Sequence, residues 1–340
     1  MKKLYFLLLC TSTAFAQFTY EPFNYSGSLN ANGWTSHSGA TGSAGQIVAL
    51  TTPSDSGNSL SFNGLQASNG NRTAIVAGNS EDINKAATAN ITTGIAYYSA
   101  LIKLQNATGL GLNTSIGDYF LGTTSLASAT TTAFQARLYI KAGTAADTFN
   151  LGVLNASGGT AAPSFVSTDL SINTTYFIVV KYDLATNTAS LWINPTPGST
   201  EPAAGATNAT GTTAAPALIA GLIIRQGGNT TAGTGNVELD EFRLGTTWSE
   251  VTPQNSASVN ENAIAGLKIY PNPNTGNTLY VTSDIIGDKS VVVFDVLGKQ
   301  ILSVSNVTDN GINIGNLKAG IYMVKVSQDG KSATRKLVVQ

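Results

Sequence analysis

The chain has 340 residues and nearly balanced charge, with 18 Lys and Arg against 19 Asp and Glu. Only 11% of its residues are charged, against roughly 25% in an ordinary soluble domain, and the sequence contains no basic run. Nucleic-acid binding therefore lacks an electrostatic basis, and an extracellular β-protein is favoured over a cytosolic enzyme. The length suggests about two domains.

The N-terminal 16 residues have the pattern of a secretory signal peptide. Two lysines precede an apolar core that opens with residues 4–9, and the small-residue sequence Ala-Phe-Ala at 14–16 offers a cleavage site. This core is too short to span a bilayer. The single cysteine, Cys10, lies in this segment, so the chain from Gln17 onward has no disulfide, catalytic thiol or cysteine zinc site.

Residues 17–251 show alternating strands separated by Gly, Asn and Thr, and no helical periodicity. The clearest strand covers residues 134–141. Alternation with a period of two places every second residue of it on one buried face. These expected core residues are Phe134, Ala136, Leu138 and Ile140.

Further strands follow along this region. Residues 176–182 are apolar on both faces, so we expect them near the centre of a sheet, paired as a hairpin with residues 189–193. Residues 220–225 and 237–244 add two more strands. With weaker runs the total reaches about ten to twelve, which is enough for a large jelly roll of two sheets.

Four segments of this region are informative together: residues 23–34, 117–120 and 191–195, and the stretch from Val237 to Trp248. They resemble the concanavalin A-like, laminin-G-like jelly rolls of secreted bacterial proteins. The resemblance implies a large β-sandwich over residues 17–251. That superfamily contains lectins, adhesion modules and glycan hydrolases, so the fold alone leaves the function open.

The strongest catalytic candidate is the sequence Glu-Leu-Asp-Glu-Phe-Arg that begins at Glu238. Laminarinase-type hydrolases of the same superfamily carry Glu-x-Asp-x-x-Glu on a strand, where two carboxylates act as a pair about 5 Å apart. The period of two places Glu238, Asp240 and then Phe242 on one face. Arg243 stands where the closing Glu is required. We therefore assign no catalytic residue and expect Asp240, Glu241 and Arg243 to make surface or edge contacts.

Other candidate groups are isolated. The only histidine, His37, lies among small polar residues, and a single histidine supports neither a triad nor a histidine metal cluster, so we expect it at the surface. No cofactor is expected, although calcium could bind Asp118, Asp240 or loop carbonyls. The three tryptophans are expected to pack inside the domain rather than stack on sugars. They are Trp34, Trp192 and Trp248.

Residues 252–266 are rich in Ser and Asn and lack a hydrophobic run, which indicates a linker. The remaining residues, 267–340, contain about six predicted strands, a suitable number for a small immunoglobulin-like β-sandwich. Hairpins are predicted over residues 291–302 and 321–339. The second surrounds Asp329-Gly330, a strong signal for a short turn.

Four motifs occur in order along this tail: Tyr-Pro-Asn-Pro, Phe-Asp followed by Gly-Lys, Leu-Lys-Ala-Gly-Ile-Tyr, and a basic terminal strand. Together they resemble the type A C-terminal sorting domain of Bacteroidota type IX secretion. Among these motifs, Gly298 and Gly320 are expected at turn positions with positive φ. The residues assigned to the sorting motifs are Tyr270, Pro271, Asn272, Pro273, Asp295, Gly298, Gly320, Tyr322 and Lys336.

The sorting resemblance implies recognition by the outer-membrane secretion machinery and passage through the periplasm to the cell surface or the extracellular space. We expect the jelly roll to be a non-catalytic carbohydrate-binding or adhesion module, with an extracellular glycan or surface polymer as partner. One alternative is a secreted, laminarinase-like glycan hydrolase. Another is a structural surface protein with no small ligand. Convergence of three acids in a groove would favour the hydrolase.

Overall fold

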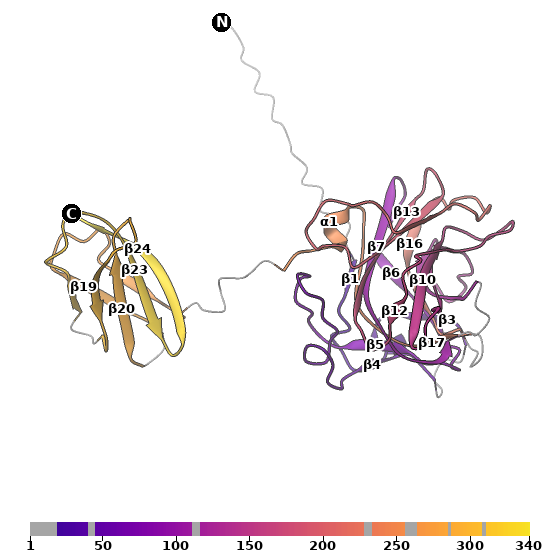
Figure 1. Ribbon diagram of the computed structural model, residues 1–340, viewed down its shortest axis with the longest axis horizontal. Coiled ribbons are helices and arrows are strands. Elements are labelled where there is room, and N and C mark those ends of the chain that lie inside the picture. The colour runs from indigo at the N-terminus through magenta and orange to yellow at the C-terminus, as the bar shows by residue number, and fades with distance from the viewer. Residues whose placement is uncertain are drawn as a thin grey trace, which may run out of the picture. The chain divides into compact units, whose positions relative to one another are not determined.

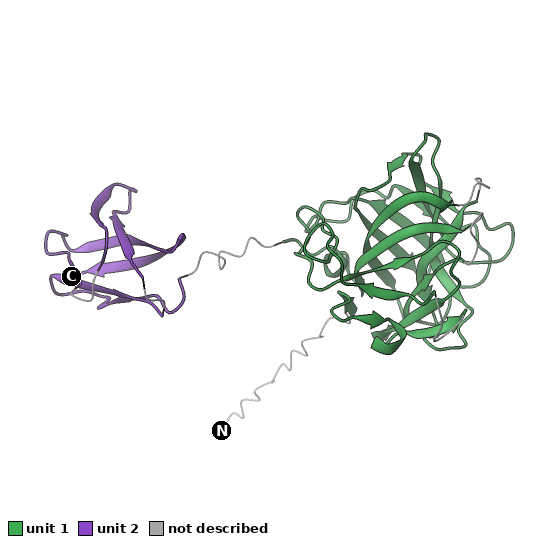
Figure 2. Cartoon of the chain, turned by 90° about the horizontal axis from the view of Figure 1, so that it is seen from below, with its two compact units in different colours: residues 1–255 green, residues 256–340 purple. Residues whose placement is uncertain are grey.

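The computed structural model describes residues 19–39, 45–110, 116–227, 233–255, 264–284, 287–307 and 311–340. The chain forms two compact units, residues 1–255 and 256–340 (Figure 2). Strands dominate both units (Figure 1), as predicted. The signal peptide expected over residues 1–16 lies outside the described residues. In the described part of the chain, no helix is long and apolar enough to cross a membrane.

The first sheet of the larger unit has nine antiparallel strands. The predicted hairpin of residues 176–182 and 189–193 is confirmed, with Ile178 opposite Ile193. The strands, in order across the sheet, are β15 (Ala206–Asn208), β14 (Thr188–Ile193), β13 (Tyr176–Asp183), β7 (Ile95–Leu110), β17 (Thr234–Gly245), β5 (Arg72–Ile75), β4 (Val48–Leu50) and β2 (Gly27–Ser28), with β1 (Thr19–Glu21) paired to β17.

The second sheet has eight antiparallel strands. In order they are β11 (Ser164–Phe165), β10 (Thr148–Leu154), β9 (Phe134–Ala142), β8 (Asp118–Thr124), β16 (Ile219–Arg225), β6 (Asp82–Ile91) and β3 (Thr35–Ser38), with β12 (Leu170–Ser171) paired to β10. A 3-10 turn, η1 (Asn30–Asn32), and a short helix, α1 (Trp248–Val251), complete the unit. Many strands have only two to four residues, too few for alternation to reveal them.

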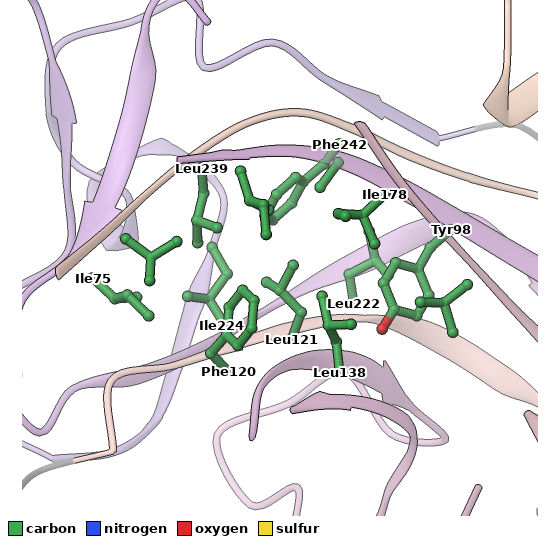
Figure 3. Packing of buried hydrophobic residues seen from close by; sticks show 14 of the residues in the cluster. Ile75, Tyr98, Phe120, Leu121, Leu138, Ile178, Leu222, Ile224, Leu239 and Phe242 are labelled. Carbon is green, nitrogen blue, oxygen red and sulfur yellow. The ribbon is translucent and has the colours of Figure 1, made fainter. Parts of the chain in front are cut away.

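The two sheets pack face to face around one apolar core, which makes this unit a two-sheet jelly-roll sandwich, as predicted. Leu239 and Phe242 of the nine-stranded sheet face Phe120 and Leu138 of the eight-stranded sheet across this core (Figure 3). All four side chains are at most 2% exposed. The core therefore fixes which face of each sheet points inward and which points away.

Strand β17 contains a bulge that the sequence pattern did not reveal. Asp240 pairs with Leu101 and Arg243 pairs with Ser99, so β17 has one residue more than β7 over this stretch. Glu241 occupies the extra position with a φ of 54°. The prediction that Phe242 shares a face with Asp240 is therefore wrong, because the bulge turns Phe242 into the core.

The bulge also creates a buried ion pair. Arg243 Nη2 lies 2.5 Å from Glu241 Oε2, and both side chains are at most 1% exposed. Arg243 Nη1 donates to the backbone oxygen of Glu241, and Tyr20 donates its hydroxyl to Glu241 Oε1 at 2.8 Å. The expectation of surface or edge contacts for these residues is wrong, because β17 lies between β7 and β5 and its outer face is covered.

A second apolar cluster covers the outer face of the nine-stranded sheet. Leu60 and Leu65 from the loop before β5, together with Trp248 and Val251 of α1, pack on strands β7, β13 and β14. The chain after α1 stays attached to the same loop, since Gln66 donates its backbone N–H to the oxygen of Pro253. Residues 252 and 253, which were expected to begin the linker, therefore belong to the larger unit.

The smaller unit is a two-sheet sandwich. Its core joins both sheets, with Leu279 from one and Val324 from the other, and includes Ile264 from the expected linker. In the predicted turn, Asp329 and Gly330 both have positive φ, 49° and 75°. One sheet has β18 (Lys268–Tyr270), β19 (Thr278–Thr282) and β22 (Ile312–Asn313), and the other β21 (Gln300–Val304), β20 (Lys289–Phe294), β23 (Gly320–Gln328) and β24 (Lys331–Val339).

The buried pair gives a stability prediction. Glu241→Gln should lower the free energy of unfolding by roughly 3–5 kcal/mol, because Arg243 keeps a buried charge without its counterion. The matched control is Asp55→Asn, which breaks the more exposed pair of Asp55 with Lys103 and should cost about 0–1 kcal/mol. Urea unfolding of both variants measures the difference. Equal losses in the two variants would show that the buried pair has no special role.

Candidate functional site

The carboxylates of Glu238 and Asp240 in β17 are buried and bind other groups of the larger unit. Glu238 is 3% exposed and lies 2.7 Å from Arg72 Nε. Asp240 is fully buried, and its two oxygens accept the backbone N–H groups of Leu60 at 2.8 Å and Glu241 at 2.7 Å. Each carboxylate is thus covered and occupied, so this segment offers no open groove in which acids converge.

Burial perturbs one of these groups strongly. Removal from water and the nearby charge of Glu241 together raise the pKa of Asp240 to about 8, while Arg243 acts in the opposite direction. A perturbed carboxyl is a frequent feature of active sites. Here burial inside its own unit accounts for the shift, and the backbone N–H groups of Leu60 and Glu241 act against it.

The other sequence candidates also prove to be structural or half-buried. Trp34, Trp192 and Trp248 are at most 8% exposed, and the last two meet edge to face at 5.0 Å. His37 is half-buried rather than at the surface. Burial lowers its pKa, and its Nδ1 lies 3.0 Å from the amide nitrogen of Asn84.

The residues suggested for calcium do not fit that ion. Asp118 Oδ1 lies 2.5 Å from Arg225 Nη1 and also accepts the N–H of Tyr119. Asp240 is occupied by backbone donors, whereas calcium takes six to eight oxygen ligands. Within the described ranges, no three His, Cys, Asp or Glu side chains gather as metal ligands do.

The outer face of the eight-stranded sheet has a different character. Phe120 and Leu138 point into the core, so Tyr119, Arg137 and Tyr139, which alternate with them, point away from it. Tyr119 pairs with Tyr139 across β8 and β9, and their rings lie 5.7 Å apart. Burial raises the pKa of both tyrosines, so both hydroxyls stay protonated at neutral pH.

Phe134 belongs to this face as well. The prediction that it lies on the core face with Ala136 is wrong, because Ala136 has a φ of 46° and interrupts the alternation. The ring of Phe134 is half-buried. It lies 5.3 Å from His37 and 6.3 Å from Tyr119. Phe134 therefore links the aromatic residues of β3 and β8 on the outer face.

Two arginines flank the central tyrosine. The guanidinium of Arg225 lies 4.5 Å from the ring centre of Tyr119, and that of Arg137 lies 5.2 Å from it. Arg225 is also paired with Asp118. We call Tyr119, Phe134, Arg137, Tyr139 and Arg225 the tyrosine–arginine face; such rings and guanidinium groups can stack on a ligand and donate hydrogen bonds to it.

Two side chains of this face keep an unsatisfied polar atom. Asn84 Oδ1 and Arg137 Nε are buried and have no hydrogen-bond partner among the described residues.

Three more buried atoms are unsatisfied away from this face. Gln135 pairs with Thr123, which alternates with the outward-facing Gly122, so its Oε1 belongs to the opposite side of the sheet. Arg243 Nε and Trp248 Nε1 lie on the side of the nine-stranded sheet. The feature particular to the tyrosine–arginine face is therefore the guanidinium of Arg137, which has no counterion in the described part of the chain.

A groove of about 530 Å³ lies elsewhere, beside β14 and β12. Its lining includes Trp192, Asn194, Thr168 and Pro202, with no charged side chain. The indole N–H of Trp192 already donates to the oxygen of Pro202 at 3.0 Å. The groove therefore differs from the tyrosine–arginine face in having no charged side chain in its lining.

In the tail, several motif residues serve the local fold. The side chain of Asn272 donates to Lys336 O at 2.7 Å and accepts the N–H of Val338 at 2.9 Å, which attaches the proline-rich segment to β24. Pro271 and Pro273 flank it, each preceded by a cis peptide bond. These residues therefore shape the edge of the sandwich where the proline-rich segment meets β24.

Other motif residues shape turns. Asp295 Oδ1 accepts the N–H groups of Leu297 and Lys299, and Gly298 has a φ of 84°, as predicted. Gly320 begins β23 and is not among the residues with positive φ, so that expectation is wrong. A Cβ at Gly320 would meet Tyr322 only at 3.8 Å, an ordinary contact.

Residues 268–340 match the family model of the secretion system C-terminal sorting domain. The match confirms the resemblance of the tail to a type IX sorting domain, and such a domain implies export to the cell surface or the extracellular space. No curated protein is similar enough in sequence to match the chain.

The solved structures to which the chain is similar are distant from it. The receptor-binding domain of a botulinum neurotoxin C/D mosaic serotype is 10% identical, with 88% of this chain and 72% of that chain covered and a TM-score of 0.36. A Trypanosoma rangeli sialidase complex is 17% identical, with 65% and 31% covered and a TM-score of 0.32. The Ca²⁺/Man2-bound exoplasmic domain of VIP36 is 11% identical, with 70% and 90% covered and a TM-score of 0.35.

The raised pKa of Asp240 predicts a pH dependence of stability. Between about pH 4 and pH 8 the unfolded chain loses this proton while the folded chain keeps it. The free energy of unfolding should therefore fall as pH rises, with a slope from this group of up to about 1.4 kcal/mol per pH unit. Urea unfolding from pH 4.5 to 8.5 should show a flatter dependence in Asp240→Asn.

The control for this experiment is Asp55→Asn, since hydrogen bonds from Thr175 and Lys103 outweigh burial and lower the pKa of Asp55. Removal of that carboxyl should leave the fall between pH 4.5 and 8.5 in place. An unchanged slope in Asp240→Asn would show that Asp240 titrates near its ordinary range.

Proposed function

We propose that this is an exported protein whose larger unit binds carbohydrate without cleaving it, through the tyrosine–arginine face. On one side of the eight-stranded sheet, aromatic rings surround the guanidinium of Arg137, which has no counterion within the described ranges, and this arrangement carries the proposal. Sugar rings present apolar faces that stack on aromatic side chains, and hydroxyl groups that exchange hydrogen bonds with amides and guanidinium groups. These two kinds of contact are available at Phe134 and Arg137, which are both half-buried.

The non-catalytic part of the proposal is supported by the state of the acids. A retaining or inverting glycosidase needs two carboxyl groups that reach the same sugar. Glu238 and Asp240 are buried and hydrogen-bonded within the unit. On the proposed binding face, Asp118 is held by Arg225. A structural surface protein without a ligand would leave the unsatisfied atoms of this face without a role.

We further propose that the two units fold independently and that the tail is recognised as a folded sandwich. Each unit has its own apolar core, built from the strands of that unit alone. The sorting residues Tyr270 and Lys336 are exposed and make no side-chain hydrogen bond with the described residues, which leaves them accessible to the secretion machinery. Their role in sorting is part of the proposal.

The binding proposal predicts a specific loss. A glycan array should identify a carbohydrate ligand for the purified protein, and Phe134→Ala should weaken its binding about tenfold, since a lost stacking contact is worth roughly 1–1.5 kcal/mol. Titration calorimetry measures the change. Because Phe134 lies off the core face, the melting temperature should stay within a few degrees of the parent value.

Phe62→Ala is the matched control, because Phe62 is also half-buried in the larger unit but packs on Phe177, on the other sheet. It should leave glycan affinity unchanged. Absence of any glycan ligand, or equal losses in the two variants, would contradict the proposed binding face. Release of reducing sugar that disappears in Glu238→Gln would contradict the non-catalytic assignment.

Export gives a second prediction. Removal of residues 256–340 should leave the larger unit folded, because its core is complete without them. In a host with type IX secretion, the truncated protein should accumulate in the periplasm, while the full chain reaches the surface or the medium. Cell fractionation with circular dichroism of the purified fragment measures both. Equal surface levels of the two proteins would refute a sorting role for the tail.

A further inference from the structure

The tyrosine–arginine face contains two arginines in different states. Arg225 has a counterion, since its Nη1 lies 2.5 Å from Asp118 Oδ1, and it also donates to the backbone oxygen of Tyr119. Arg137 makes no hydrogen bond or ion pair with any described residue, and its Nε is buried and unsatisfied. Arg137 therefore has a positive charge and directed donors that the folded chain leaves unused.

The nearby carboxylates cannot neutralise Arg137 without giving up existing bonds. Asp82 accepts the hydroxyl of Ser38 at 2.6 Å and the N–H of Gln226 at 3.1 Å. Asp118 is held by Arg225. The next cation along β9, Lys141, lies 4.2 Å from the ring centre of Phe165. The carboxylates near Arg137 are thus already hydrogen-bonded to other residues, and its cationic neighbour Arg225 adds positive charge.

The position of Arg137 is built into the sheet. A Cβ at Gly122 of β8 would lie 3.4 Å from Cγ of Arg137, so the glycine leaves room for the arginine stem. The guanidinium is held over the ring of Tyr119 at 5.2 Å. The side chain is half-buried, so its charged end is still reached by solvent. Because the Arg137 side chain is already held in place, less conformational entropy is lost when a ligand binds it.

We infer that the ligand of this face is an acidic saccharide whose anionic group, a carboxylate or a sulfate ester, binds Arg137. A guanidinium presents parallel N–H donors that match the oxygens of either group. Tyr119 lies under the guanidinium of Arg137, and the half-buried ring of Phe134, 6.3 Å from Tyr119, provides a surface for the sugar ring. The inference rests on the proposed glycan binding and adds the chemical class of the ligand.

The test compares charged and uncharged forms of the same sugars. Oligogalacturonate and its methyl ester probe the carboxylate, and a sulfated galactan oligosaccharide and its desulfated form probe the sulfate. Titration calorimetry with the purified full chain should show tighter binding of at least one acidic form. Arg137→Met should reduce that affinity roughly ten- to hundredfold, as expected for a lost charged hydrogen bond, and should leave the neutral form nearly unchanged.

Lys103→Met is the matched control, because it removes one positive charge near Asp55, on the nine-stranded sheet. It should change the acidic-sugar affinity less than twofold. If Arg137→Met fails to fold, Arg137→Lys provides the second variant, which keeps the charge but loses the paired donors and should bind the acidic sugar at least several-fold more weakly.

Three results would overturn the inference, and they differ in what they say of the proposed function. Binding of neutral and acidic forms with equal affinity, lost in Phe134→Ala, would reject the acidic ligand and retain glycan binding. A preference for acidic sugars that survives Arg137→Met, or is lost equally in Lys103→Met, would reject the role of Arg137 alone. No binding of any of the four sugars, alongside a negative glycan array, would reject both proposals.

Discussion

Strand β17 has one residue more than its neighbour β7 between Asp240 and Arg243, and both faces of the nine-stranded sheet depend on this insertion. On the inner face, Phe242 reaches the core and packs 5.4 Å from Phe23 and 6.2 Å from Trp34, which ties the N-terminal segment to the sandwich. On the outer face, Arg243 pairs with Glu241. Without the extra residue, an aromatic ring and a charged group would exchange places, at the cost of burying an unpaired charge in an apolar core.

This constraint makes the two outer faces chemically unequal. On the nine-stranded sheet, the charges of β17 are consumed by partners of the fold: Glu238 by Arg72, and Asp240 by backbone N–H groups. Apolar residues around Leu60 and Trp248 then close much of that face. On the outer face of the eight-stranded sheet, the half-buried Arg137 has no counterion among the described residues. A guanidinium that folding leaves unpaired and partly exposed can bind an anionic ligand, so the proposed binding is expected there.

Alternation predicted the longer strands, both tail hairpins and the sandwich of the larger unit, because it reports directly which side chains leave water. It failed at Phe134 and at Phe242, and for the same reason. Each lies close to a non-glycine residue with positive φ, Ala136 and Glu241, where the period of two is broken. Such bulges have no local sequence signal. Alternation did predict that Arg137 and its neighbour Leu138 lie on opposite faces of their strand. Whether an outward-facing arginine has a counterion depends on strands that are distant in the sequence.

In the tail, unlike in the larger unit, residues that shape the local fold could be identified from the sequence. Its motifs could be recognised because much of their chemistry is required by the backbone: Asn272 binds β24 on both its amide atoms, Asp295 accepts two N–H groups of its turn, and Gly298 has a positive φ. A motif of this kind reports a fold shared by many proteins, and it carries no information about the unit that precedes it. The larger unit has no equivalent. The residues of its tyrosine–arginine face come from three strands, β8, β9 and β16, and they form a site only when the sheet brings these strands together.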